Sequence, residues 1–260
     1  MRVITNADDF GMSDELVEAT IECFENGSLT SATIMPRMPG TEKAAAYARS
    51  RPDLSFGVHL TFVCDTVEAP VSDPRGLPTL VGADGRFLAS NRVRVMGLRN
   101  QIPVDEIATE VEAQVRSLQE RGVAISHVDS HGHLHKFRPF RRALARVLPG
   151  LGVRRVRSAQ DIYLKKPLKS FNYWYGKVWR RKIRAAFVTT DHFYMPSSAW
   201  DVDWGPRLLE VMRGLRGSTI EVGVHPGYSE AWRDNERTSL LAFTEAARRD
   251  GHSIEGWNAV

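Results

Sequence analysis

Short runs of apolar, often β-branched residues alternate along this chain with longer segments in which apolar residues recur every three or four positions. The short runs predict buried strands, and the longer segments predict helices with one apolar face. We expect strands at about residues 2–6, 31–35, 55–61, 124–130, 153–157, 186–190 and 219–225. We expect helices at about residues 13–26, 40–50, 103–121, 137–147, 168–182, 205–215 and 236–250. This alternation of strand and helix is typical of α/β proteins with a parallel sheet.

The alternation runs along nearly the whole chain, so a single domain, residues 1–260, is the simplest interpretation. It predicts a distorted (β/α) barrel of about seven parallel strands. Residues 65–102 interrupt the pattern because they are rich in proline and glycine and show no sustained period. Segments of this length in compact domains are usually lids or binding loops. We therefore expect an insertion that covers a substrate; the alternative is a disordered surface loop.

Half of the eight histidines of the chain lie within the nine residues HVDSHGHLH. Histidine and aspartate occupy every second position of this run: His127, Asp129, His131, His133 and His135. In an extended chain, alternate side chains point to the same face, so we expect these five groups to converge. Histidine is the commonest metal ligand and the usual acid or base at neutral pH. The run therefore predicts a metal or acid–base site, with a histidine-rich surface loop as the alternative.

Three other predicted strands end in groups of the same kind. Asp8 and Asp9 follow the first strand, while His59 and His225 lie in or after the apolar runs GVHL and VGVH. The carboxyl ends of parallel strands meet at one edge of the sheet, where α/β proteins place their chemistry. An Asp that forms a turn or a His buried in a core would explain each position alone. Their shared placement at strand ends favours one common site.

Four motifs occur in order along the chain: NADDFG from Asn6, GVHL from Gly57, HVDSHGHLH from His127 and HPGY from His225. Together they resemble the YdjC-like carbohydrate deacetylases, from about residue 1 to residue 245. That family includes chitooligosaccharide deacetylases and deacetylases associated with hopanoid biosynthesis. The resemblance implies a distorted barrel and a metal-dependent hydrolase that cleaves the amide bond of an N-acetylated sugar, either an oligosaccharide or a lipid-linked glycan.

The resemblance also implies a role for individual residues. Asp9, His59 and His131 correspond to the family's ligands for one divalent metal ion, Asp8 to its general base and His225 to a candidate acid. Two histidines with one carboxylate suit Zn, Fe, Co or Mn, and Mg in a water-rich site. The sequence does not choose between these metals, and we expect Mg or Zn. Four further residues are weaker candidates for contacting substrate or supporting the ligands: Asp129, His133, His135 and Tyr228.

The chain departs from the family pattern at a few positions. Thr61 and Phe62 follow the GVHL motif where a polar continuation is more usual in the family. Gly132 stands where histidine is common, and His192 stands where arginine is frequent. The proposed ligands are all present, so these changes concern the identity of the sugar more than the chemistry. The alternative activity is a metal-dependent phosphoesterase, whose sites also gather Asp and His at strand ends. A degenerate carbohydrate-binding protein is a third interpretation.

Composition agrees with a cytoplasmic enzyme. The content of hydrophobic residues, 42% of 260, is enough for a large core, and no apolar run approaches the ~20 residues that span a bilayer. The first residues lead directly into a predicted strand, which argues against a signal peptide. Cys23 and Cys64 show no spacing typical of a metal site, and we expect Cys23 to be a small buried apolar residue. The sequence leaves the oligomeric state open, a homodimer included.

Residues 165–184, KKPLKSFNYWYGKVWRRKIR, are rich in lysine and arginine and contain no acidic residue. The same segment holds several aromatic side chains: Phe171, Tyr173, Trp174, Tyr175 and Trp179. One interpretation is a helix with an aromatic inner face and a solvated basic outer face. The other is contact with an anionic membrane or an acidic glycan, which would place the enzyme at the inner face of the membrane. The net charge of +4 is small and no nucleic-acid-binding motif is present, so we expect no nucleic-acid partner.

Overall fold

The structure, a computed structural model, describes residues 1–165, 168, 170–197 and 202–260. The strands are β1 (Arg2–Phe10), β2 (Ser31–Ile34), β3 (Ser55–Leu60), β4 (Ile125–Ser130), β5 (His192–Tyr194), β6 (Thr219–Val224) and β7 (Ser253–Glu255). The α-helices are α1 (Asp14–Glu25), α2 (Thr41–Ser50), α3 (Ser90–Leu98), α4 (Val104–Glu120), α5 (Arg138–Val147), α6 (Phe171–Arg184), α7 (Trp204–Met212) and α8 (Ala231–Arg249). Short 3-10 helices are η1 (Pro74–Gly76), η2 (His131–Lys136), η3 (Leu148–Leu151) and η4 (Trp257–Ala259).

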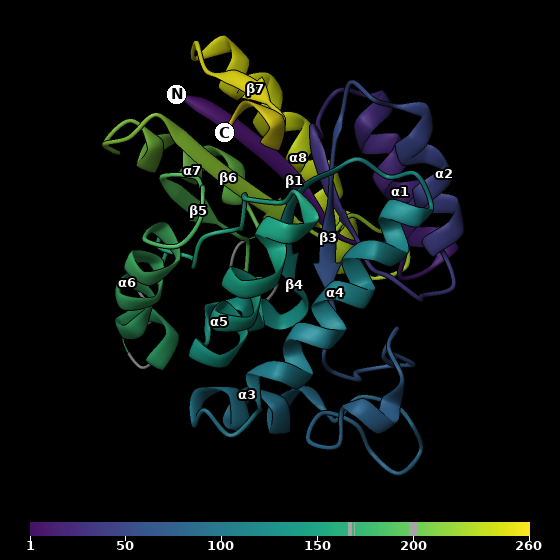
Figure 1. Ribbon diagram of the computed structural model, residues 1–260. Helices are drawn as coiled ribbons and strands as arrows, with labels where there is room; N and C mark the ends of the chain where they lie inside the picture. The colour runs from purple at the N-terminus through teal and green to yellow at the C-terminus, as the bar shows by residue number, and fades with distance from the viewer. Residues whose placement is uncertain (166–167, 169, 198–201) are drawn as a thin grey trace.

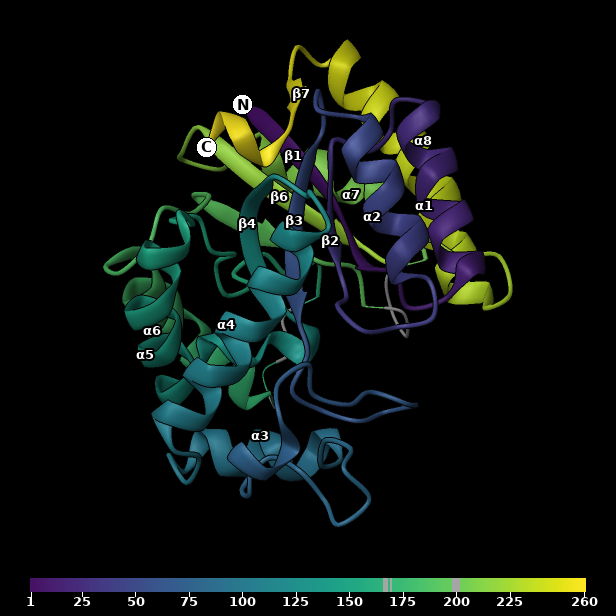
Figure 2. The same ribbon diagram turned by 45° about the vertical axis from the view of Figure 1, so that its right-hand side comes forward.

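The strands form one parallel sheet in the order β4-β3-β2-β1-β6-β5, and β7 pairs with β1 at its amino end. The sheet curls into a half-barrel flanked by helices, with α1, α2 and α8 on one side of the molecule and α6 on the opposite side (Figures 1 and 2). Because the neighbouring strands are parallel, the carboxyl ends of β1, β3, β4 and β6 lie at the same edge. The predicted parallel α/β fold with a distorted barrel is confirmed.

Two of the predicted strands are shorter in the structure than the sequence suggested. Residues 153–157 and 186–190 pair only through isolated bridges, Val128 with Val156 and Arg155 with Val188. These bridges extend the curve of the sheet beyond β4. Arg157, where the predicted strand ends, donates its backbone amide to Val128 of β4 at 3.0 Å and directs its side chain toward carboxylates of other strands.

Helix α3 lies within the insertion and was not predicted, while the other α-helices follow the predicted order. Helix α7 ends at Met212, before the predicted residue 215, and two more helices differ in where they begin. Helix α8 begins at Ala231, several residues before the predicted start, and α6 begins at Phe171, so it is shifted toward its carboxyl end. Residues 166, 167 and 169 of the predicted helix lie outside the described residues. No helix in the described ranges is long and apolar enough to cross a bilayer.

The insertion at residues 65–102 is a packed unit that contains η1 and α3. Its apolar side chains Leu77, Leu80 and Val93 are fully buried. Glutamates of α4 hold its backbone: Glu110 accepts hydrogen bonds from the amides of Val71 and Ser72, at 2.8 and 3.0 Å. Figures 1 and 2 show the insertion at the end of the molecule opposite both termini, beyond the carboxyl end of β3. It is therefore ordered against the edge of the sheet that carries the polar strand ends, and its role as a lid stays a prediction.

An aromatic cluster ties the sheet to α1 and α2. The ring of Phe10 lies 6.2 Å from Phe56 on β3 and 6.4 Å from Phe24 on α1, and Tyr47 of α2 completes the group. Cys23 is fully buried beside them, as the sequence indicated. Edge-to-face and offset contacts of this kind add to the stabilisation that the buried area provides.

A close approach of β3 to β4 gives a first prediction. A Cβ atom on Gly57 would lie 2.6 Å from the carbonyl oxygen of His127 and 2.8 Å from its ring. That ring cannot easily move because it stacks on Trp257, with ring centroids 4.6 Å apart. Gly57→Ala should therefore lower the free energy of unfolding by about 1–3 kcal/mol, measured by urea denaturation. Gly150→Ala is the matched control, since nothing lies within 4 Å of its added Cβ. Equal stabilities of the two variants would contradict the packing argument.

Candidate metal centre

A β-bulge at the end of β1 brings two consecutive aspartates to the same region. Adjacent side chains on a regular strand point to opposite faces. Here the pairing of β1 with β2 shifts register between Ala7 and Phe10, and Asp9 adopts a left-handed backbone conformation with φ of 58°. Bulges and positive φ at residues other than glycine are concentrated at functional sites. As a result, carboxylate oxygens of both Asp8 and Asp9 lie near the ring of His59.

Asp9, His59 and His131 form a compact group of potential metal ligands. One ligand atom from each residue lies within 4.8 Å of the others. The Oδ1 atom of Asp9 is 3.4 Å from Nε2 of His59 and 3.1 Å from Nδ1 of His131. Asp9 and His59 are each only 2% exposed, while His131 is partly open to solvent. One carboxylate and two imidazoles leave coordination positions free for water and substrate, so this donor set fits a catalytic divalent cation.

Asp129 fixes the orientation of His59. Its Oδ1 atom accepts a hydrogen bond from Nδ1 of His59 at 2.7 Å, and its Oδ2 atom accepts one from the hydroxyl of Thr33 at 3.0 Å. With Nδ1 engaged, Nε2 of His59 faces Asp9. A carboxylate behind a ligating histidine, in this arrangement, sets the tautomer and strengthens the ligand. Asp129 therefore lies behind His59, and its support of a metal ligand stays a prediction.

A second group of donors, Asp8, His59 and Asp129, is also close enough to hold a cation. The guanidinium group of Arg157 already lies there. Its Nη1 atom is 2.6 Å from Asp8 and 2.6 Å from Asp129. A cationic side chain so close to both carboxylates disfavours a metal ion at the same place. The site therefore has two parts. The part at Asp9 is open to a metal ion, and Arg157 neutralises the part at Asp8 and Asp129.

Arg157 is the central cation of the buried network. It is fully buried and also pairs with Glu221 of β6 at 2.7 Å. Burial alone would raise the pKa of Asp8, but Arg157 and the nearby histidines outweigh burial and hold that pKa well below its usual range. Burial outweighs Arg157 at Glu221, whose pKa is raised to about 7. Asp8 is therefore an ionised carboxylate at neutral pH.

His59 and His131 carry protons in the metal-free protein. Burial alone would lower both pKa values, but Asp129 and Asp9 raise that of His59 to about 10. Asp65 and Asp9 raise the pKa of His131 to about 9. Metal ligation requires neutral imidazole, so binding of a metal must release these protons.

His225, directly after β6, is held by a glutamate of α8. The Oε2 atom of Glu236 lies 3.2 Å from Nδ1 of His225, and Nε2 of His225 lies 4.0 Å from Oδ2 of Asp8. Burial alone would lower the pKa of His225, but Glu236, Asp9 and Asp8 raise it. The ring of Trp232, at the start of α8, lies 5.5 Å from the His225 ring. This histidine is therefore close to the site, oriented by a carboxylate and favoured in its protonated form.

Asp65 and Arg233 border the Asp9–His131 pair from two other segments. Asp65, the first residue of the insertion, lies with Oδ2 3.4 Å from Nε2 of His131. Arg233 of α8 donates to Oδ2 of Asp9 at 2.9 Å and so anchors the oxygen that does not face the histidines. The insertion and α8 thus contact the ligand cluster directly.

The five histidine and aspartate side chains of HVDSHGHLH do not all converge, as they would in an extended chain. Strand β4 ends at Ser130, and the chain then turns through η2 with positive φ at Gly132 and His133, 64° and 56°. The turn keeps His131 beside Asp9 and directs His133 elsewhere, with its ring 5.8 Å from Phe193. Glycine at position 132 is compatible with this turn because it adopts positive φ without steric cost.

His127 and His135 have structural surroundings. His127 is fully buried, donates a hydrogen bond from Nε2 to Oδ1 of Asn6 at 3.1 Å and stacks on Trp257. His135 is 1% exposed and its Nδ1 atom lies 2.8 Å from the hydroxyl of Ser130. Burial leaves His135 without the surface that contact with a sugar would need.

Tyr228 lies on the surface beside α1. Its hydroxyl donates to Glu22 at 2.7 Å, and the guanidinium of Arg237 lies 5.1 Å from the centre of its ring. Its contact with substrate stays a prediction.

Sequence reasoning missed several residues of the site: Asp65, Arg157, Glu221, Trp232, Arg233 and Glu236. Arg157 could have been found, because it follows Val156 at the end of a predicted strand, as the aspartates and histidines do. The others lie in helices, in the insertion or within a strand, where no local pattern distinguishes them from surface or core residues.

The fold and the site define a parallel α/β protein with an Asp–His–His cluster at the carboxyl edge of its sheet. A family model for the YdjC-like protein matches residues 2–252, and the chain belongs to this family. It is 30% identical to a carbohydrate deacetylase of Thermoanaerobacter pseudethanolicus over 241 residues, which cover 93% of this chain and 85% of the relative. A carbohydrate deacetylase of Halalkalibacterium halodurans is 35% identical over 139 residues, 54% of this chain, and the match spans only 56% of that relative.

A solved structure has the same fold over the whole chain. It is a protein of Enterococcus faecalis V583 whose proposed activity is cellobiose-phosphate cleavage. The two chains superpose with a TM-score of 0.81 and 22% sequence identity, over 99% of this chain and 98% of the other. At this identity the likeness establishes the fold.

The buried network gives a second prediction. Arg157→Met should lower the free energy of unfolding by about 3–5 kcal/mol at neutral pH, because it leaves buried carboxylates without their cation. Arg116→Met removes a surface partner of Glu112, whose side chain is 48% exposed, and should change stability by no more than about 0.5 kcal/mol. Urea denaturation of both variants is the measurement. A small effect of Arg157→Met would show that the network does not hold the strands together.

Proposed function

We propose that this protein is a divalent-metal-dependent hydrolase that removes the acetyl group from an N-acetylated sugar. Membership of the YdjC-like family and similarity to relatives named carbohydrate deacetylase support the sugar and the deacetylation. One observation supports the metal dependence: ligand atoms of Asp9, His59 and His131 gather within 4.8 Å at the carboxyl edge of the sheet. We propose Mg or Zn as the ion and an N-acetylated oligosaccharide or lipid-linked glycan as the substrate.

Asp9, His59 and His131 would hold the cation. When bound, a divalent ion supplies a Lewis acid that polarises the acyl oxygen and makes water more acidic. Asp129 keeps Nε2 of His59 directed at the ion's position, through its hydrogen bond to Nδ1. Arg233 keeps Asp9 in place through the other carboxylate oxygen.

Asp8 is placed to act as the general base. Its Oδ1 atom accepts from both Asn6 and Arg157, while Oδ2 accepts from Arg157 and faces His225. Oδ2 therefore has the greater capacity to accept a proton from the attacking water. The ion pair keeps the carboxylate ionised and oriented, and it also limits its basicity. Asp8 therefore contributes to the reaction mainly through its position and less through its affinity for a proton.

His225 is placed to act as the general acid. Water adds to the acyl carbon, the carbon–nitrogen bond breaks, and the departing nitrogen needs a proton. Glu236 holds Nδ1 of His225, so Nε2 is the atom that can donate. The raised pKa of His225 favours the protonated form before the reaction. The products are acetate and the free amino sugar.

Release of acetate from N-acetylglucosamine oligomers, with and without a chelator, is the direct test of this activity. We expect release that chelator abolishes and that added divalent metal restores. Phosphate release from a generic phosphoester is the companion assay, because Asp and His clusters also serve phosphoesterases. Phosphate release without acetate release would replace the proposed function by phosphoester hydrolysis. Binding of the oligomer without either product would indicate a carbohydrate-binding protein.

The ligand assignment gives a third prediction. His131→Ala should lose the bound divalent metal and the activity while keeping the fold, because His131 lies at the partly exposed margin of the cluster. Elemental analysis after dialysis measures the metal, and circular dichroism measures the fold. His252→Ala is the matched control, since His252 lies beside the amino terminus, where its ring contacts the Met1 amine. Full metal occupancy in His131→Ala would defeat the assignment.

The base assignment gives a fourth prediction. Asp8→Asn should retain the metal and lose a factor of ~10²–10⁴ in kcat, the usual contribution of a positioned base. Asp9→Asn should lose the metal itself, because Asp9 supplies the carboxylate of the ligand group. Loss of metal in Asp8→Asn together with retention in Asp9→Asn would exchange the two roles.

A further inference from the structure

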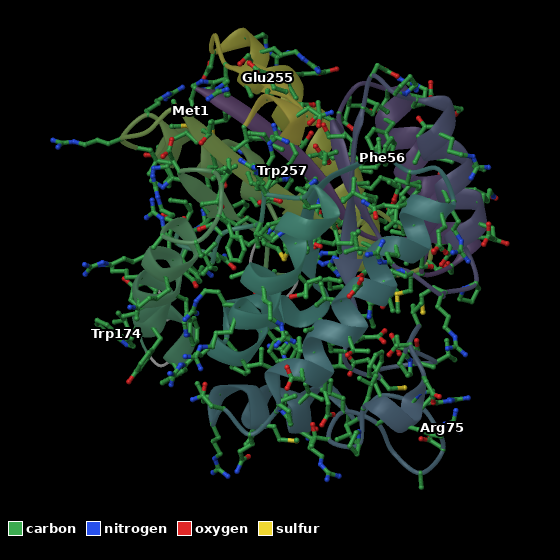
Figure 3. All side chains as sticks on the ribbon, viewed as in Figure 1. Met1, Phe56, Arg75, Trp174, Glu255 and Trp257 are labelled. Carbon is green, nitrogen blue, oxygen red and sulfur yellow. The ribbon has the colours of Figure 1, made fainter. Side chains whose placement is uncertain are left out.

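Helix α6 carries an exposed apolar stripe on the side that faces away from the protein. Phe171, Trp174, Tyr175 and Val178 follow one another at the spacing of a single helix face and are 45%, 62%, 48% and 52% exposed. Leu168, just before the helix, is 61% exposed. We refer to these five side chains as the outer stripe. Figure 3 shows Trp174 at the outer margin of α6, directed away from the body of the protein.

The opposite side of α6 is packed in the usual way. Trp179 and Ile183 are buried, at 8% and 0% exposure. Arg180 points inward too, since it pairs with Asp161 at 2.7 Å. The inner side therefore already supplies the burial that holds the helix to the domain, and the outer stripe is additional to it. The expectation of aromatic residues inside and only basic residues outside is wrong for this helix.

The outer stripe is ordered by its own contacts. Phe171 and Tyr175 stack with ring centroids 4.0 Å apart, and the indole of Trp174 donates to the carbonyl of Leu168 at 2.8 Å. Single exposed apolar residues are common, but a contiguous patch of large ones marks an interaction surface.

Cations flank the stripe. Lys177, Arg181 and Lys182 are exposed on the same helix, and residues 165–184 contain no acidic side chain. Lysine and arginine beside an apolar helical face are the features of helices that lie in the interface of an anionic bilayer. Tryptophan and tyrosine are the side chains that settle at the level of lipid headgroups.

We propose that the outer stripe and its flanking cations dock the protein on the surface of an anionic lipid bilayer. Acidic polysaccharide or nucleic acid would satisfy the cations equally well. Neither offers an apolar layer for Leu168 and Val178, which have no polar group to present. The lipid surface is the one partner that matches both halves of this helix.

The docking surface lies across α6 from a pocket on the inner side of the helix. Gly176 and Trp179 of the inner side line this pocket of about 160 Å³ together with His133, Lys136 and Tyr163. A helix with its side chains is ~10–12 Å across, so docking would hold the pocket about that far from the headgroups. The proposal stands without the proposed function.

Cosedimentation of the full chain with vesicles tests the proposal. Vesicles of phosphatidylcholine alone are compared with vesicles that also contain phosphatidylglycerol, at low and moderate salt. We expect binding only to the anionic vesicles, weaker at moderate salt because the charges are screened. A combined Lys177→Glu, Arg181→Glu and Lys182→Glu variant should bind at least tenfold more weakly. The matched control reverses three exposed arginines elsewhere, Arg116, Arg142 and Arg249, and should retain most of the binding.

A second variant distinguishes insertion of the outer stripe into the bilayer from attraction between charges alone. Trp174→Ser with Val178→Ser removes apolar area from an exposed surface, so folding should be unaffected, as checked by circular dichroism. Binding to anionic vesicles should again fall at least tenfold. Failure of wild type to bind either vesicle at both salt concentrations would overturn the proposal. So would equal loss in the control variant, or capture by a soluble acidic polysaccharide in place of vesicles.

Discussion

The structure depends on one buried cation, Arg157, which pairs with carboxylates from three strands. Asp8 of β1, Asp129 of β4 and Glu221 of β6 converge on its guanidinium at distances of 2.6–2.7 Å. Without a cation between them, the three buried carboxylates would repel one another. The contacts of Arg157 therefore determine the role of each carboxylate. Asp8 stays ionised beside the open part of the site, and Asp129 is free to hold His59.

The ion pairs of Arg157 also divide the polar residues at the strand ends into two groups. On one side Arg157 neutralises the carboxylates. On the other, Asp9, His59 and His131 face one another, and Arg233 pairs with the Asp9 oxygen that does not face the histidines. The bulge at Asp9 makes this division sterically feasible, because it directs two consecutive aspartates into one site.

The sequence predicted the parallel fold and the strand ends that carry Asp8, Asp9, His59, His131 and His225, because strand periodicity and polar termini are local signals. It mispredicted the path after Ser130, where positive φ at Gly132 and His133 turns the chain out of the strand. It also missed Arg157 and Glu236, whose partners lie far away in the sequence. No periodicity reports a contact between Arg157 and Asp8, which are separated by 149 positions. Long-range electrostatic pairing was therefore visible only in three dimensions.

The central claim is that the cation binds on the Asp9 side of the cluster and not on the Arg157 side. A crystal structure of the protein with zinc, using anomalous diffraction at the zinc edge, tests this claim most directly. The account predicts one anomalous peak, bounded by Asp9, His59 and His131, with Arg157 still paired to Asp8. A peak between Asp8 and Asp129 with Arg157 displaced, or no peak within the cluster, would contradict it.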